Sequence, residues 1–465
     1  MGIDRGNQLL HRIGPPTKIK SGLFIAIAVI ILELIGGMQS YLNQLILPIM
    51  ANDLHGQNYY GVILGASSIA TMTGLPIGAA LMNRVRLVRL LVGATLVLVF
   101  GALVSAVAPS VIVFVIGSIL RGLAGSILAM TSLGAVALGL SGRARQLTLA
   151  FASASWVVAS VVGPAYAAWV THLLSWRWAI LLYLPFLLAA RFVIAFNLKT
   201  ESQKKDAPMS YQALFLIIIG VGVTIVPIAG IGKILLLLVG IGLLTRVAIL
   251  LMPSGTFSQR TQRRAALAGM FFLTGSYFAA NELVSLTAHD LFDASAKSLG
   301  YILTGGGLAW ALLGVFCGIK PASSMLAYRI RSSIGLTLLL LSTAAISVVS
   351  LTDSSLSHPT VFFVILWTLA GTGMGLTYLD TLNIFFEDPA VPDGITIEEM
   401  ASSSVIVESL SSTMFIPLTS SIVAMAFTNQ QVTSTLPYGI SWLIVVGLAF
   451  VAFYYLMGVQ SSKNS

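Results

Sequence analysis

Charged side chains stand inside apolar stretches of this sequence, where they could carry chemistry: Glu33, Arg121, Glu282, Asp380 and Glu408. A charge at the centre of a membrane helix costs about 2.5–3.5 kcal/mol on insertion scales, so it usually faces a protein interior or a water-filled cavity. Burial favours the neutral form of a carboxylate, and a nearby arginine favours its charged form. A carboxylate that alternates between two such surroundings can take up and release a proton. These residues are therefore candidates for proton-coupled chemistry at membrane depth.

Arg121 and Glu33 are the pair on which this hypothesis depends most. Arg121 is the single charge in the apolar run 111–130, and Glu33 lies about twelve residues into the first apolar run. Counted at 1.5 Å per residue along two oppositely directed helices, the two residues reach a similar depth. We therefore expect Arg121 to face the protein interior, with Glu33 or another polar residue of the first helix, such as Gln39 or Asn43, nearby. The alternative is a structural salt bridge that only holds two helices together.

The sequence gives less support for a functional role of the other three acids. Glu282 follows Asn281 in the middle of a later apolar run, whereas Glu408 stands among serines that could equally form a close-packed helix face. Asp380 lies near the end of its run, where an acid can gate a pathway or simply be solvated. A functional role for each remains an expectation.

Continuous apolar runs position all of these residues. The 465-residue chain is 57% hydrophobic and only 9% charged, whereas soluble domains average about 25% charged. Its mean hydropathy is +0.94. The runs are continuous and do not alternate, so they predict an all-α polytopic membrane protein with 14 transmembrane helices. The predicted helices cover residues 21–50, 59–82, 88–108, 110–139, 147–170, 177–197, 211–229, 232–252, 266–289, 298–319, 332–351, 359–386, 399–427 and 437–458.

Lysines and arginines predict the topology. Most of the 25 basic residues lie in the N-terminal segment or in every second loop, a group that includes Arg191, and the opposite loops hold only Arg177, Lys233 and Lys297. By the positive-inside rule both termini are cytoplasmic, and this placement requires an even number of spans. We expect a multi-pass protein of the cell membrane.

The spacing of the runs predicts two six-helix bundles joined by two linker helices. The predicted parts are a cytoplasmic segment 1–20, an N-terminal bundle 21–198, a linker region 199–264, a C-terminal bundle 265–458 and a tail 459–465. A basic loop follows the second helix of each bundle, as a duplicated unit would have. Duplicated bundles are a common transporter plan, with the substrate site between the halves near the midplane.

Several short motifs resemble the major facilitator superfamily, and within it the 14-helix drug:proton antiporter branch. Residues 120–125, LRGLAG, are similar to the R-x-x-(Q)-G motif of the fourth helix, and residues 162–168, VGPAYAA, resemble the Gly-Pro motif of the fifth. Residues 175–185 are similar to the W-R-W-x-F-x-x-N-x-P entry to the sixth helix, with Tyr183 for Asn. Asn83, Arg84 and Arg86 stand where the family reads D-R-x-G, so the acid and the glycine are missing. The first helix lacks the usual acid, because Gln39 occupies its position when Pro48 is aligned.

The resemblance implies roles for these motif residues. It implies a major facilitator fold, links Arg121 to proton coupling, makes Gly125 part of the same helix-four motif, and makes Gly163 and Pro164 a hinge in the fifth helix. It also implies that Asn83, Arg84 and Arg86 form a gating loop. For the hinge the alternative is an ordinary membrane kink, and for the loop it is a purely topogenic role.

Together these features predict a secondary active transporter. We expect proton-coupled export of hydrophobic or amphipathic small molecules, cationic ones included, by alternating access. The alternatives are an importer of a specific metabolite, a non-transporting sensor or scaffold with the same fold, and a membrane-embedded enzyme, for which no nucleophile, base or metal cluster is apparent. We expect no cofactor and no metal, since the single Cys317 and the scattered histidines have no ligand spacing. The expected partners are protons, a small-molecule substrate and the lipid bilayer, with no nucleic acid, and we expect a monomer.

Overall fold

Helices make up nearly all of the chain that the computed structural model describes. The described residues are 19–140, 142–197, 211–226, 228, 231–253, 256–258, 262–352, 356–386, 397–428 and 431–458. Residues 1–18, 198–210 and 459–465, which cover the predicted terminal segments and the polar part of the linker region, lie outside this set. So does most of the acidic connection 387–398.

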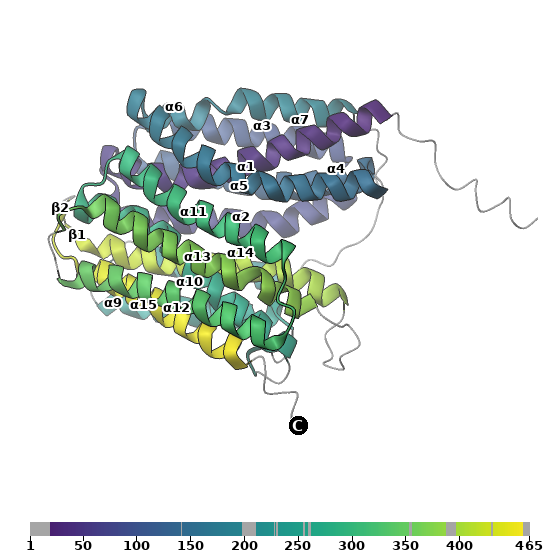
Figure 1. Cartoon of the computed structure of the whole chain (residues 1–465). Helices are drawn as coiled ribbons and strands as arrows, with labels where there is room; N and C mark the ends of the chain where they lie inside the picture. Colours follow the sequence, from purple (N-terminus) through teal and green to yellow (C-terminus); the bar gives the residue numbers. More distant parts are fainter. Residues whose placement is uncertain are drawn as a thin grey trace, which may run out of the picture.

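The N-terminal half forms six membrane-length helical segments, with the broken helix counted as one (Figure 1). They are α1 (Ile19–Asp53), α2 (Tyr60–Arg84), α3 (Leu87–Ala106), α4 (Val111–Gly139), α5 (Gly142–Leu173) and the broken helix α6 (Trp176–Leu181) plus α7 (Leu184–Asn197). The short 3₁₀-helix η2 (Gln57–Tyr59) joins α1 to α2. Helix α1 packs against α4, α5, α6 and α7, and α4 in turn packs against α2 and α3.

The C-terminal half also has six helices, and α10 contacts each of the other five. Its helices are α10 (Gln262–Phe292), α11 (Ala296–Ile319), α12 (Met325–Thr352), α13 (Pro359–Phe386), α14 (Ile397–Val423) and α15 (Leu436–Gly458), with η3 (Thr256–Ser258) before α10. A 3₁₀-helix η4 (Ala424–Ala426) and the antiparallel strands β1 (Phe427–Thr428) and β2 (Gln431–Val432) lie between α14 and α15. Helices α11 and α13 approach so closely that a Cβ on Gly371 would overlap the backbone of Gly306. Glycines thus allow the tight helix contact expected in a membrane bundle.

The two linker helices pack against the seam between the bundles. Helices α8 (Tyr211–Ile225) and α9 (Ile231–Leu251) contact each other, and both also contact α14, while α8 reaches α2. On the other side of the seam, α5 of the first bundle packs against α11 of the second. Figure 1 shows the two bundles one above the other, with β1 and β2 at one end of the seam. We call that end the hairpin end, and the opposite end, where α2 ends at Arg84, the basic end.

The predicted fold class is confirmed, because all fourteen predicted helices are present when α6 and α7 are counted as one. In the described part of the chain, twelve helices are long and apolar enough to span a membrane. Of the other two, α8 has only 15 residues, and α10 is a long helix with many polar side chains. Helix α10 is buried along most of its length among α13, α14 and α15. A helix enclosed by protein faces no lipid and can therefore be polar.

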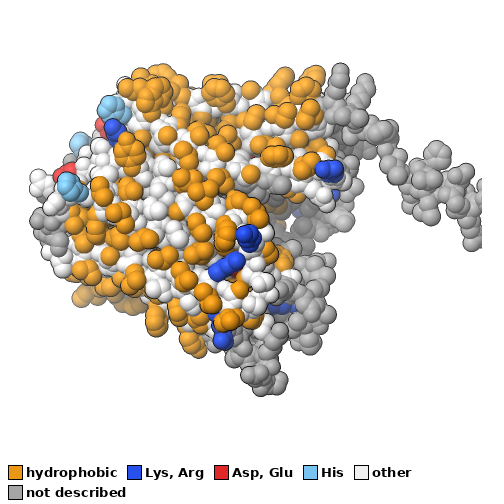
Figure 2. Space-filling model, in the orientation of Figure 1, with side chains coloured by type: hydrophobic (Ala, Val, Ile, Leu, Met, Phe, Trp, Pro, Cys, Tyr) orange, Lys and Arg blue, Asp and Glu red, His pale blue; other side chains and the backbone are white. Residues whose placement is uncertain are grey.

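Several helices begin earlier than predicted at the basic end. Helix α5 begins at Gly142 instead of 147, and α12 begins at Met325 instead of 332. The added turns contain Arg143, Arg145 and Arg329, which were counted as loop residues. Arginine is a good helix former, and its long side chain reaches water from inside a helix end. Figure 2 shows the resulting surface, which is hydrophobic over its middle with charged side chains toward both ends.

Candidate functional site

The largest cavity lies between the two bundles on the basic side of the molecule. It has a volume of about 970 Å³ and is lined by α1 and α5 from one bundle and by α11, α13 and α14 from the other. Its lining reaches Leu149 and Ile319, which are exposed near the basic end. Most of the lining is apolar, and the polar and aromatic members are Glu33, Tyr41, Trp156, Trp310, Tyr378 and Glu408. We call this space the main cavity.

Glu408 is held in the main cavity by a tyrosine from a neighbouring helix. The hydroxyl of Tyr378 on α13 donates a hydrogen bond to Oε1 of Glu408 on α14. The hydroxyl of Ser412 donates to the backbone oxygen of Glu408 at 2.7 Å, so the serines around Glu408 serve the helix backbone rather than its carboxylate. The carboxylate is thus oriented by one strong donor and still faces the cavity.

Glu33 lies in the same cavity but is associated with a different arginine from the one expected. It stands within hydrogen-bonding reach of the indole of Trp156 and within electrostatic reach of Arg191. Arg191 was counted among the loop cations, and that assignment is wrong: it lies inside α7, is only 8% exposed, and donates from Nη1 to Oγ of Ser132 at 2.8 Å. Sequence reasoning missed Arg191 because it stands in the last turns of an apolar helix, where a snorkelling cation is the usual interpretation.

Glu282 lines a second cavity, which lies nearer the hairpin end and shares the lining residue Glu408 with the first. This cavity has a volume of about 360 Å³ and lies between α1, α2, α10 and α14. Glu408 lines both cavities, and Glu282 reaches across the seam to the side chain of Gln44 on α1. Asn281, beside Glu282, is partly exposed. Glu408 is therefore the carboxylate shared by the two cavities, with Glu33 in the first and Glu282 in the second.

Arg121 lines a third cavity, of about 340 Å³, inside the N-terminal bundle. Its Nη2 donates to Oδ1 of Asn43 on α1 at 2.9 Å, so the expected contact with a polar residue of the first helix is present. Gln39 and Gly125 also line this cavity, and Asn43 lines the second cavity as well. The guanidinium thus faces protein and is connected to the Glu282 site through Asn43.

The similar depth expected for Arg121 and Glu33 is wrong. Arg121 lies ten residues from the hairpin end of α4, as Asn43 does in α1, whereas Glu33 lies ten residues further along α1. Ten residues correspond to about 15 Å of helix. Helix α1 is longer than predicted at both ends, and the two helices are aligned at their hairpin ends rather than at the predicted boundaries. Arg121 therefore shares its level with Glu282, and Glu33 stands much nearer the basic end.

Asp380 forms a buried ion pair outside the main cavity and lines a separate cavity of about 640 Å³ at the basic end. Its carboxylate accepts from Nη1 of Arg331 at 3.2 Å and from the backbone N–H of Ala322 at 3.1 Å, and it is 1% exposed. Arg331 also donates to the backbone oxygen of Lys320 at 2.6 Å. The cluster ties α13 to the connection between α11 and α12, which is the basic loop of the second bundle.

Of the remaining residues in the family-like motifs, some lie in helix contacts and others lie on the surface. A Cβ on Gly163 would lie 3.1 Å from Cα of Met38, so this glycine lets α5 approach α1 closely. Pro164 follows within α5, which remains one continuous helix. Arg84 and Arg86 are exposed at the basic end between α2 and α3. The side chain of Asn83 lies outside what the structure describes.

Metal-ligand side chains are not clustered in the described part of the chain. Within the described ranges no three His, Cys, Asp or Glu side chains are grouped so that they could hold a metal ion.

Known proteins resemble this chain in sequence. The multidrug efflux pump SdrM of Staphylococcus aureus (strain N315) is 20% identical over 207 residues, which is 44% of this chain and 46% of that protein. The fatty acid resistance protein FarB of Neisseria gonorrhoeae is 22% identical over 210 residues, covering 45% and 41%. The multidrug export protein EmrB of Haemophilus influenzae is 23% identical over 211 residues, covering 45% and 41%. In each case the chain spans less than half the length of the relative.

Solved structures share the fold over nearly the whole chain. A POT family transporter in complex with a thioalcohol-conjugated peptide superposes with a TM-score of 0.65 at 13% identity, covering 95% of this chain and 97% of that one. A variant of the nucleoside transporter NupG superposes with a TM-score of 0.62 at 10% identity, covering 94% and 99%. At these identities the likeness shows the fold alone. The sequence profile described as Major Facilitator Superfamily matches residues 29–396, and with this match the chain belongs to that superfamily.

Proposed function

We propose that this protein exports hydrophobic or amphipathic small molecules, cationic ones included, in exchange for protons. The observation that carries the proposal is the main cavity, in which the carboxylates of Glu33 and Glu408 stand among aromatic side chains. Aromatic ring faces and carboxylates both attract organic cations, and a mostly apolar lining suits hydrophobic ligands. The relatives SdrM and EmrB, named as a multidrug efflux pump and a multidrug export protein, agree with this substrate class.

The proposed mechanism is alternating access of the cavity between the two bundles. Proton and substrate compete for the same carboxylates, because a cation is held by the charged form and released by the neutral form. Glu408 and Glu33 serve as the exchanging groups, and Glu282 extends the path toward the hairpin end. Under the positive-inside prediction the basic end is cytoplasmic, so the cavity described here would load from the cytoplasm across the cell membrane.

A reconstituted system tests the proposal directly. Purified protein in liposomes is given a pH gradient, and the movement of ethidium, an organic cation, is followed by fluorescence. We expect movement that stops when a protonophore dissipates the gradient and that is lost in Glu33→Gln. Transport that continues at the same rate without a gradient would sink proton coupling.

The relative FarB suggests an anionic amphipathic substrate for comparison. Laurate in place of ethidium provides that arm of the experiment. Because the main cavity presents carboxylates rather than cations, we expect ethidium to be moved faster than laurate. The opposite order would keep export but overturn the assigned charge preference.

A further inference from the structure

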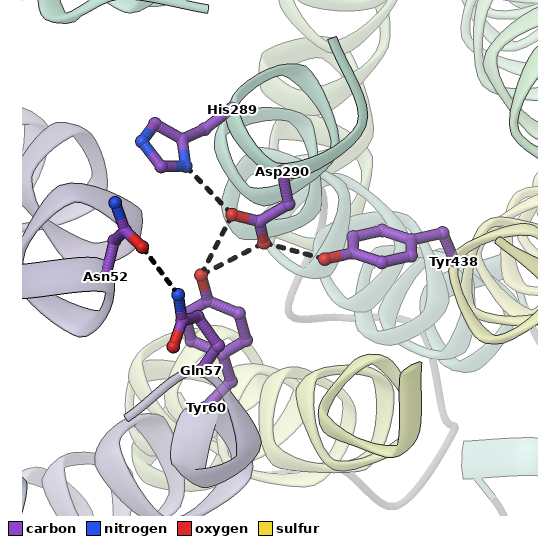
Figure 3. Close-up of polar contacts among 6 residues, drawn as sticks. All are labelled: Asn52, Gln57, Tyr60, His289, Asp290 and Tyr438. Atoms are coloured by element: carbon purple, nitrogen blue, oxygen red, sulfur yellow. Dashed lines mark hydrogen bonds and ion pairs between the residues drawn. The ribbon is translucent and has the colours of Figure 1, made fainter. Parts of the chain in front are cut away.

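A buried carboxylate closes the hairpin end of the seam between the bundles. Asp290, near the end of α10, accepts a hydrogen bond from the hydroxyl of Tyr438 at 2.6 Å and from that of Tyr60 at 3.0 Å to Oδ2 and 3.2 Å to Oδ1. Nδ1 of His289 lies 2.8 Å from Oδ1. Figure 3 shows the side chains converging on the carboxylate, which is 4% exposed.

The partners of Asp290 come from both bundles. Tyr438 lies in the first turn of α15 and His289 precedes Asp290 in α10, so these two move with the carboxylate as parts of the C-terminal bundle. Tyr60 begins α2 and belongs to the N-terminal bundle. Its hydrogen bond therefore crosses the seam, and that of Tyr438 does not.

Tyr60 is also enclosed by the opposite bundle beyond its hydrogen bond. Its side chain is 0% exposed, and its ring meets the edge of Phe427 on β1 with centroids 5.9 Å apart. The next residue, Gly61, packs so closely on Ser421 of α14 that an added Cβ would lie 2.8 Å from Cα of Ser421. The hairpin end is thus shut by close packing around one charge-assisted hydrogen bond.

Separation of the bundles at this end must break the Tyr60 bond. A hydrogen bond to a charged group stabilises more than one between neutral groups. When Tyr60 withdraws, Asp290 keeps the donor from Tyr438, so the carboxylate is never left without a partner and the bond can form again on closing. We propose that Tyr60 and Asp290 form a latch that holds the hairpin end closed while the main cavity is open toward the basic end. This inference rests on the proposed alternating access.

A distance measurement across the hairpin end tests the latch. The native Cys317 is replaced by alanine, and spin labels are attached at Ser110→Cys, between α3 and α4, and at Lys297→Cys, at the start of α11. Both positions are exposed and lie in different bundles. Pulsed electron paramagnetic resonance then gives the distance distribution for the parent, for Tyr60→Phe and for Tyr438→Phe.

The two tyrosine substitutions are a matched pair, because each removes one hydroxyl that donates to Asp290. We expect Tyr60→Phe to raise the ratio of the long-distance to the short-distance population about tenfold. Tyr438→Phe should leave the ratio near that of the parent, since its bond does not cross the seam. Unchanged distances in Tyr60→Phe, or an equal shift in Tyr438→Phe, would overturn the latch.

A second variant keeps the test decisive if Tyr60→Phe does not purify as folded protein. Asp290→Asn retains the shape of the side chain and removes its charge, so we expect a smaller shift in the same direction, and an unchanged distribution would again refute the latch. The measurement needs neither substrate nor proton gradient. If the parent does not transport but Tyr60→Phe shifts the distances, the latch stands and the proposed function fails. If the parent transports but Tyr60→Phe leaves the distances unchanged, the proposed function stands and the latch fails.

Discussion

The two ends of the inter-bundle seam use charged groups in opposite ways. At the hairpin end, the carboxylate of Asp290 is enclosed and hydrogen-bonded by tyrosines from both bundles. Toward the basic end, the carboxylates of Glu33 and Glu408 line an open cavity of about 970 Å³, each with an aromatic donor from its own bundle. Bonds across the seam resist separation, whereas bonds within one bundle only orient a side chain.

The difference suggests that the two ends of the seam have different roles, one in holding the bundles together and the other in binding. In the proposed mechanism, groups at the hairpin end decide how readily the bundles part, and groups toward the basic end meet the proton and the substrate. Glu282 and Arg121 lie between them at a common level, about 15 Å from the hairpin ends of their helices. Substitutions at the three levels should therefore have different consequences, with the largest effect expected at Glu408 and the smallest at Asn43.

Glu408→Gln should abolish proton-coupled transport and leave folding intact. The amide cannot exchange a proton, but it has the same size and still accepts the hydrogen bond from Tyr378. The measurement is ethidium movement in liposomes under a pH gradient. Tyr378→Phe is the matched control, because it removes the donor and keeps the carboxylate, and it should retain coupling. If Glu408→Gln transports as the parent does, Glu408 is not a proton-exchanging group, and Glu33 alone is left for that role in the main cavity.

Asp380→Asn should lower the free energy of unfolding by about 3 kcal/mol, because it breaks a buried ion pair with Arg331. Transport per folded molecule should not change, since Asp380 lies outside the main cavity. The check is thermal unfolding in detergent beside the transport assay. Asp53→Asn, in the exposed pair with Arg177 at the hairpin end, is the control and should cost less than about 1 kcal/mol. A coupling defect in Asp380→Asn would return this carboxylate to the functional site.

Gly61→Ala should favour the state in which the hairpin end is open. The added methyl group has no room against Ser421, and such overpacking costs about 1–3 kcal/mol in the closed state alone. The spin-label distances across the hairpin end report the shift. Gly93→Ala introduces the same methyl group at a position with no atom within 4 Å and should leave the distances as they are. Equal behaviour of the two variants would mean that packing at Gly61 does not hold this end closed.

Asn43→Ala should slow transport about fivefold, a loss of about 1 kcal/mol, and should preserve its dependence on protons. The substitution removes the acceptor for Arg121, which remains in a cavity that water can enter. Initial rates with and without a gradient measure both quantities. Complete loss of coupling would move the proton chemistry from the carboxylates of the main cavity to the level of Arg121.

The number and order of the helices could be predicted from the sequence because each span is a continuous apolar run that is recognisable by itself. Fourteen apolar runs were recognisable one at a time, including α10, whose polar residues were not numerous enough to hide it. Helix ends were less predictable at the basic end, since arginines such as Arg143 continue a helix as readily as they begin a loop. The contact between Arg121 and Asn43 was also within reach, because a charge in an apolar helix needs a polar neighbour.

The pairing of the charges was decided by the tertiary structure. Glu33 is near Arg191 rather than Arg121, and Asp380 is neutralised by Arg331, because the level of each residue depends on how the helices are aligned with one another. The latch could not be predicted from the sequence either, since Tyr60, Asp290 and Tyr438 lie near the ends of three helices that are far apart in the sequence. Hydropathy is a property of one segment at a time, so the sequence by itself determined the membrane fold and its polar candidates. The alignment of two bundles involves contacts between distant segments, and only the tertiary structure decided which candidates face one cavity and which close its end.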